Sequence, residues 1–113
     1  MYPTGYNCLV IEIRKYRCPD GAIPFDRWMA KLRDERAKTR ILVQLDRLKL
    51  GLRGDWKSIG EGVFELRIFE GKGYRVYFAH AGKSIVILLC GGDKSTQSRD
   101  IELAKSYWRT HRR

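Results

Sequence analysis

The strongest constraint on the fold is a pair of alternating segments with three residues between them. Segments 63–70 (VFELRIFE) and 74–80 (YRVYFAH) place an apolar residue at every second position, and Gly71-Lys72-Gly73 separates them. An alternation of period two is typical of a β-strand, and so short a connection joins antiparallel neighbours. The sequence therefore predicts a β-hairpin.

The alternation also selects how the two strands pair. If residues 71–73 form the loop, the alternating apolar residues of both strands share one side, whereas a slip of one residue mixes the sides. On the opposite side this register places Arg67 across from Tyr77. Its neighbours there complete a cluster of two guanidiniums, a phenol and a carboxylate, which are those of Arg67, Arg75, Tyr77 and Glu65.

Helical spacing of apolar residues precedes the hairpin, over about 24–33 and about 35–50, with Pro24 suited to the first helical turn. Further strands are expected over 8–14, 56–59 and 84–90. The last of these is apolar on both faces and is ended by Gly91-Gly92, and a final helix follows, capped by Ser95 or Thr96.

This order predicts one α+β domain over residues 1–113. An N-terminal strand and a helical hairpin pack on a twisted, mostly antiparallel sheet, and a C-terminal helix ends the chain.

Charge is the strongest signal in the composition. The chain has 23 Lys and Arg against 13 Asp and Glu, a net charge of +10 on 113 residues. Such a field attracts polyanions, with nucleic acid the first candidate and an acidic protein the second. The alternative is a basic surface that has no partner.

The cysteines and the N-terminus bear on location and metals. Cys8, Cys18 and Cys90 are odd in number and widely spaced, so we expect neither a disulfide framework nor a zinc site, and Cys8 and Cys90 suit an apolar core. No signal peptide or membrane-length apolar run is evident. We therefore expect a cytoplasmic protein without membrane contact, metal or cofactor.

The polar cluster suggests phosphate chemistry. Guanidiniums bind phosphate and stabilise the extra charge of a phosphorane, a role for Arg67 and Arg75, with Glu65 as the candidate base. Lys94 follows the last strand beside a helix N-terminus, a place suited to phosphate. The expected RNA-binding residues are Tyr77, Lys72, Lys57 and Arg53. The alternative is an exposed sheet face with a Glu–Arg ladder and no ligand.

Three other polar residues have simpler interpretations. His80 falls on the core side at a strand end, where a partly buried structural histidine is expected, and His111 lies in a basic tail. Asp93 is either a second catalytic carboxylate or a helix cap.

Two segments, GEGVFELRIFEGKGYRVYF and ILLCGGDKSTQSRDIELAKSYW, resemble the addiction-module killer proteins related to phage Gp49 and HigB, within the RelE/ParE toxin superfamily. The resemblance covers nearly the whole chain. It implies the RelE-like fold and a toxin that cuts mRNA on the ribosome. It also implies a cognate antitoxin, often a helix-turn-helix protein, encoded by an adjacent gene.

The resemblance carries over to single residues. Arg67 in ELR, Arg75 in GYR and Lys94 fall where RelE-type toxins place basic catalytic residues. Glu65 stands where RelE itself has a lysine, and the last helix lacks an early tyrosine. A ParE-like poison of DNA gyrase and a non-enzymatic module that binds nucleic acid or antitoxin stay open, although the clustered basic residues favour RNA cleavage.

Overall fold

The computed structural model describes residues 10–52 and 54–113. The start of the predicted first strand, including Cys8, and Arg53 therefore lie outside the described residues. Within them no helix is long and apolar enough to cross a membrane.

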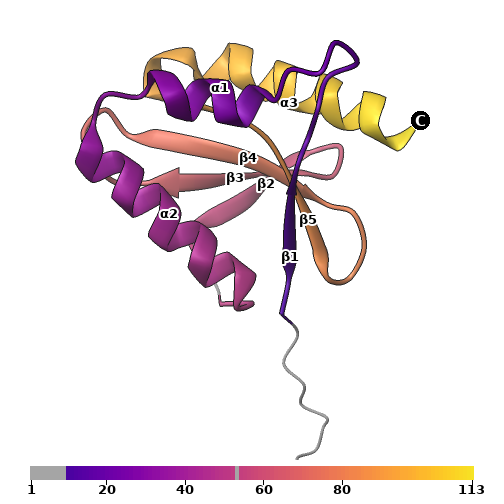
Figure 1. The fold of residues 1–113 in the computed structure, drawn as a ribbon, viewed down its shortest axis with the longest axis horizontal. Coiled ribbons are helices and arrows are strands. Elements are labelled where there is room, and N and C mark those ends of the chain that lie inside the picture. Colours follow the sequence, from indigo (N-terminus) through magenta and orange to yellow (C-terminus); the bar gives the residue numbers. More distant parts are fainter. Residues whose placement is uncertain (1–9, 53) are drawn as a thin grey trace, which may run out of the picture.

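Within residues 10–52 and 54–113, five strands form one mixed, mostly antiparallel sheet in the order β1-β5-β4-β3-β2 (Figure 1). Only the β1–β5 pair is parallel. The strands are β1 (Glu12–Lys15), β2 (Trp56–Gly60), β3 (Val63–Ile68), β4 (Tyr74–His80) and β5 (Ile85–Asp93). The α+β prediction with a mostly antiparallel sheet is confirmed.

The part of the chain that the structure describes also holds three α-helices: α1 (Pro24–Lys31), α2 (Glu35–Lys49) and α3 (Gln97–Arg112), the last preceded by the short 3-10 helix η2 (Lys94–Thr96). Pro24 opens α1 as predicted, because its fixed backbone angle suits a first turn and it has no N–H to leave unpaired. Asp34 caps α2, its Oδ1 accepting from the backbone N–H of Ala37 at 3.0 Å.

The sheet has an apolar core on each face. Helices α1 and α2 cover one face, where Phe25 and Ile41 pack on Leu66, Val76 and Phe78. Helix α3 covers part of the other face through Ala104 and Trp108, which pack with Val63, Tyr77 and Leu89. The two cores use alternate residues of the same strands, so α1 and α3 lie on opposite faces of the sheet. The polar side of the hairpin is therefore the side that α3 covers in part.

The observed register of the hairpin differs from the predicted register by two residues. Arg67 faces Arg75 and Glu65 faces Tyr77, where Arg67 opposite Tyr77 was expected. The loop is longer than 71–73, because Ile68 ends β3 and its carbonyl accepts from the N–H of Glu70 at 3.0 Å. A shift of two residues leaves every side chain on its expected side.

The prediction that Gly91-Gly92 ends a strand is wrong, since β5 continues through both to Asp93. The glycines instead admit close neighbours. A Cβ on Gly91 would lie 2.2 Å from the Trp28 ring of α1, and one on Gly92 would lie 1.8 Å from the carboxylate of Asp100 in α3. The pair therefore allows helices on both faces to approach the same strand.

We predict that Gly91→Ala lowers the free energy of unfolding by about 1–3 kcal/mol, because the new methyl group overlaps the Trp28 ring. Urea denaturation measures the loss. Gly54→Ala is the matched control, since its Cβ would come no closer than 3.4 Å to a neighbouring atom. In a Trp28→Leu background the Gly91→Ala change should cost less. An equal cost in both backgrounds would show that the ring is not the cause.

Candidate functional site

The carboxylate of Glu65 lies at the centre of the polar side of the hairpin. Its Oε2 accepts hydrogen bonds from the Tyr77 hydroxyl at 3.0 Å and the Gln97 amide at 2.8 Å, and it lies 3.5 Å from Nε of Arg75. Glu65 is 0% exposed. A buried charge is tolerated when it is paired and hydrogen-bonded, so these contacts join β3 and β4 to the first turn of α3.

Arg67 and Arg75 face each other directly across β3 and β4. Like charges at facing positions destabilise a sheet, and here each guanidinium has its own carboxylate. Glu65 serves Arg75, and Oδ1 of Asp55 lies 3.2 Å from Nη2 of Arg67. The Arg67 side chain is 40% exposed and that of Arg75 only 12%. Arg67 is therefore the guanidinium that a ligand reaches first.

The four residues of the predicted cluster do lie together, but two of them are inaccessible. Tyr77 is 0% exposed, like Glu65. Burial, followed by the nearby charge of Glu65, raises the pKa of the Tyr77 phenol, so the phenol stays protonated and donates to Glu65. Neither side chain offers a surface to a ribose hydroxyl or a base. Their expected contacts with RNA therefore have no place in this arrangement.

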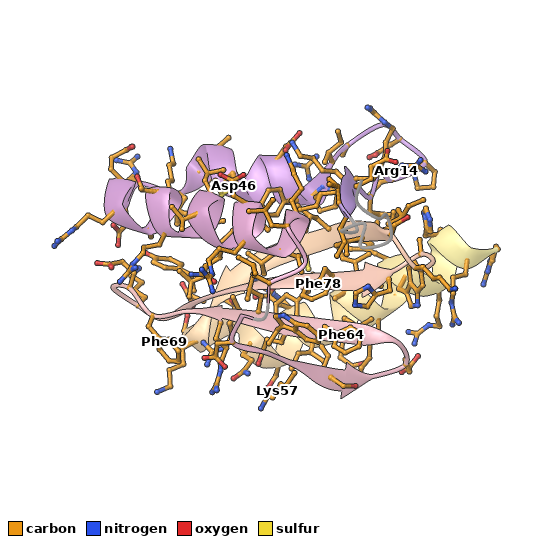
Figure 2. All side chains as sticks on the ribbon, turned by 90° about the horizontal axis from the view of Figure 1, so that it is seen from below. Arg14, Asp46, Lys57, Phe64, Phe69 and Phe78 are labelled. Atoms are coloured by element: carbon orange, nitrogen blue, oxygen red, sulfur yellow. The ribbon has the colours of Figure 1, made fainter. Side chains whose placement is uncertain are left out.

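Three lysines predicted to belong to the site are exposed. Lys57 faces Glu65 across β2 and β3 and points away from α2 (Figure 2). Lys72 lies in the hairpin loop and Lys94 in η2, both exposed. These predicted residues do not contact Glu65 through any described hydrogen bond or ion pair.

Asp93 is a cap, one of the two roles that the sequence allowed. Its Oδ1 accepts from the backbone N–H of Ser95 at 2.8 Å and from the Ser95 hydroxyl at 2.6 Å, and these bonds hold its pKa below the usual range. Thr96 precedes α3, but its side chain makes no cap bond to that helix. Its hydroxyl instead donates to Asp100 at 2.5 Å, whose pKa burial raises.

Both histidines pack on aromatic rings. His80 lies on the core side as expected, its ring 5.2 Å from that of Phe64 and 5.7 Å from that of Phe78, but it is exposed where partial burial was predicted. His111 belongs to α3 and stacks on Trp108 at 5.5 Å. Neither contacts the arginine cluster through a described interaction.

Cysteines and metal ligands follow simple patterns. Burial raises the pKa of Cys90 to about 12, in keeping with its expected place in the core. Across residues 10–52 and 54–113, no three His, Cys, Asp or Glu side chains are grouped so that they could hold a metal ion.

Sequence reasoning missed three residues of the site. Gln97 fixes Glu65, and its only signal was its place in the GGDKSTQ segment. Asp55 pairs with Arg67, and nothing in the sequence marked it. Phe69 is 70% exposed, and the Arg67 guanidinium lies 5.5 Å from its ring. Figure 2 shows Phe69 at the hairpin end of the sheet.

Comparison with known proteins now bears on the site. The model of the phage-derived Gp49-like protein family (DUF891) matches residues 27–109. The chain belongs to this family. The Gp49-like proteins are part of the RelE/HigB-type toxin group, which confirms the resemblance seen in the sequence. An uncharacterized protein of Haemophilus influenzae is 54% identical over 83 residues, 74% of this chain and 84% of that protein.

In this Gp49-like protein we expect different losses of unfolding free energy when the Glu65–Arg75 pair and the Asp55–Arg67 pair are broken. Glu65→Gln should lower the free energy of unfolding by about 3 kcal/mol, because it leaves the enclosed Arg75 guanidinium without its counter-charge. Asp55→Asn changes the same chemical group in the exposed Arg67 pair and should cost less than about 1 kcal/mol. Urea denaturation of both variants measures the difference. Equal costs would contradict the structural role of Glu65.

Proposed function

We propose that this protein is the toxin of a type II toxin–antitoxin system and an endoribonuclease that cuts mRNA on the ribosome, in the cytoplasm and without a metal. The Gp49-like family belongs to a toxin group, which supports the first part. The observation that carries the second part is the facing pair of Arg67 and Arg75. A like-charge pair costs stability, and an anion bound between or over the guanidiniums would relieve that cost.

The chemistry that this arrangement supports is transfer of a phosphoryl group within RNA. The 2′-hydroxyl gives its proton to solvent water as its oxygen attacks the adjacent phosphorus, a cyclic phosphate forms, and the bond to the 5′-oxygen breaks. Arg67, the more exposed guanidinium, would meet the growing negative charge on the phosphoryl oxygens. Arg75 adds positive charge from its largely enclosed position.

Glu65 and Tyr77 take positioning roles in this proposal. Glu65 lies 3.5 Å from Nε of Arg75, and Nη1 of Arg75 donates to the Gly73 carbonyl at 2.9 Å, so the guanidinium is held at two points. Tyr77 and Gln97 in turn hold Glu65. Because Glu65 is fully buried, it does not reach a 2′-hydroxyl and is not the base. We propose the exposed Lys94 ammonium as the proton donor to the leaving oxygen.

A toxin of this charge needs a partner in its own cell, and the family implies an antitoxin. A net charge of +10 favours an acidic surface on that partner, because opposite fields speed association. We propose that the adjacent gene encodes it, with a helix-turn-helix domain. The two proteins should co-purify through an interface that buries at least about 1,000 Å².

We predict that Arg67→Ala reduces RNA cleavage by about 10²–10³-fold, since one positioned charge donor is lost from the transition state. Mapping of mRNA 5′ ends after induced expression, together with growth arrest, measures the effect. Arg67→Lys should restore little, because an ammonium lacks the planar pair of donors. Arg14→Ala is the matched control, an exposed strand arginine that pairs with Glu12 on the far edge of the sheet.

A supercoiling assay separates the competing mechanism. Loss of gyrase activity without new mRNA ends would favour a ParE-like poison over a ribonuclease. Growth arrest by Arg67→Ala equal to that by the unchanged protein would refute the role of Arg67. Absence of both activities would leave a module that only binds nucleic acid or antitoxin.

A further inference from the structure

Two adjoining hollows lie at the hairpin end of the molecule, and of the residues that line them the proposed mechanism uses only Lys94. The larger, of about 660 Å³, lies where the α1–α2 connection meets the hairpin loop and the end of β5. The smaller, of about 600 Å³, continues it toward η2, and Lys72 and Asp93 line both. Each volume is in the range of about 300–1,000 Å³ typical of ligand sites.

Four cations line these hollows: Lys31, Arg33, Lys72 and Lys94. All four are exposed, and none forms an ion pair with a carboxylate of the described residues. The protein's other basic side chains include several that are paired, such as Lys15 with Asp26 at 2.7 Å. Positive charge therefore exceeds negative charge in the lining, which holds four cations and the carboxylates of Asp34 and Asp93.

The two carboxylates at the same place are occupied by backbone groups. Asp34 caps α2 and lies 3.5 Å from the Tyr74 hydroxyl. Asp93 caps η2 through Ser95. Both carboxylates already accept hydrogen bonds within the fold, and the four cations outnumber them, so the lining keeps a net positive charge for an incoming anion.

The shape of the hollow is fixed by tight packing. Gly71 takes a backbone angle φ of 53°, and a Cβ there would lie 2.6 Å from Oδ2 of Asp34, so the hairpin loop and the α2 cap fit only with glycine at this position. Trp28 and Tyr74 line the hollow with their rings 6.3 Å apart. The cations therefore project from a rigid, partly aromatic base.

We propose that this hollow binds the sugar–phosphate backbone of single-stranded RNA, as a second anchor beside the cleavage site. The inference rests on the proposed function and extends it. The hairpin loop that carries Lys72 joins the two strands that carry Arg67 and Arg75, so a strand of RNA that crosses the arginines reaches the hollow by passing around this loop to the side of α1. Mobile lysine ammoniums suit repeated phosphates, whereas an apolar protein partner would find most of the aromatic surface buried.

The test compares two double variants with the same loss of charge. Lys31→Gln with Arg33→Gln neutralises the hollow at the α1–α2 connection. Lys83→Gln with Arg113→Gln removes two exposed cations at the opposite end of the molecule, in the β4–β5 turn and at the C-terminus (Figure 1). Neither pair belongs to the proposed catalytic machinery. Fluorescence anisotropy measures binding of a short single-stranded RNA whose 2′-O-methyl groups block cleavage.

We expect the variant in the hollow to bind this RNA about fivefold to tenfold more weakly and to lose about 1.4 from the slope of log affinity against log salt, two contacts of about 0.7 each. The control variant should stay within about twofold of the unchanged protein, because distant charges are largely screened. Equal losses in both variants would reduce the effect to net charge and overturn the proposal. Unchanged RNA binding with lost antitoxin binding would also overturn it, in favour of a protein interface.

The outcome does not depend on cleavage. If the unchanged protein cuts no RNA, the proposed function fails, but weaker binding of the methylated RNA by the hollow variant still supports the anchor. If the unchanged protein cuts RNA and the hollow variant binds and cuts equally well, the anchor fails alone.

Discussion

The enclosed Glu65 carboxylate is the contact on which the functional end of the molecule depends. It contacts β4 through Tyr77 and Arg75 and also α3 through Gln97. A charged group in this position is stable only while all its partners are in place, since each loss leaves a charge in a poorly solvated site. The cost of burying it therefore ties the placement of α3 to the orientation of Arg75, and thereby fixes one of the two facing guanidiniums.

Strand β5 provides the complementary constraint from the apolar side. Gly91 receives the Trp28 ring from α1, and the neighbouring Gly92 receives the Asp100 carboxylate from α3, because adjacent residues of a strand face opposite sides. Helices α1 and α3 thus approach β5 from opposite faces at two neighbouring residues. Both helices are held against the end of β5, where Arg33 and Asp34 of the α1–α2 connection line the same hollow as Asp93.

The sequence was sufficient for the element types and for the side of the sheet on which each hairpin residue lies, because both depend on periodicity. It was insufficient where the outcome depends on how closely segments approach one another in the folded chain. The loop from Phe69 to Gly73 shifted the register by two residues, which periodicity cannot detect. Gly91-Gly92 suggested a break, because a strand glycine looks the same whether the chain turns or a ring packs on it. The burial of Glu65 and Tyr77 depends on α3 covering them, a tertiary contact that no local pattern encodes.

Net charge alone does not show where the surface of a basic protein is positive. Here the partners of the carboxylates at the hairpin end decide it. Glu65 is turned inward to Arg75, while Asp34 and Asp93 accept from backbone N–H groups at helix starts. All three lie at the hairpin end, where each already has an ion-pair or hydrogen-bond partner within the protein. The cations there, Arg67 and the four that line the hollows, face outward. Folding therefore leaves the unpaired basic side chains of this end at the surface, beside the facing arginines. Such a surface is what an anionic polymer, with a charge at every repeat, is suited to follow.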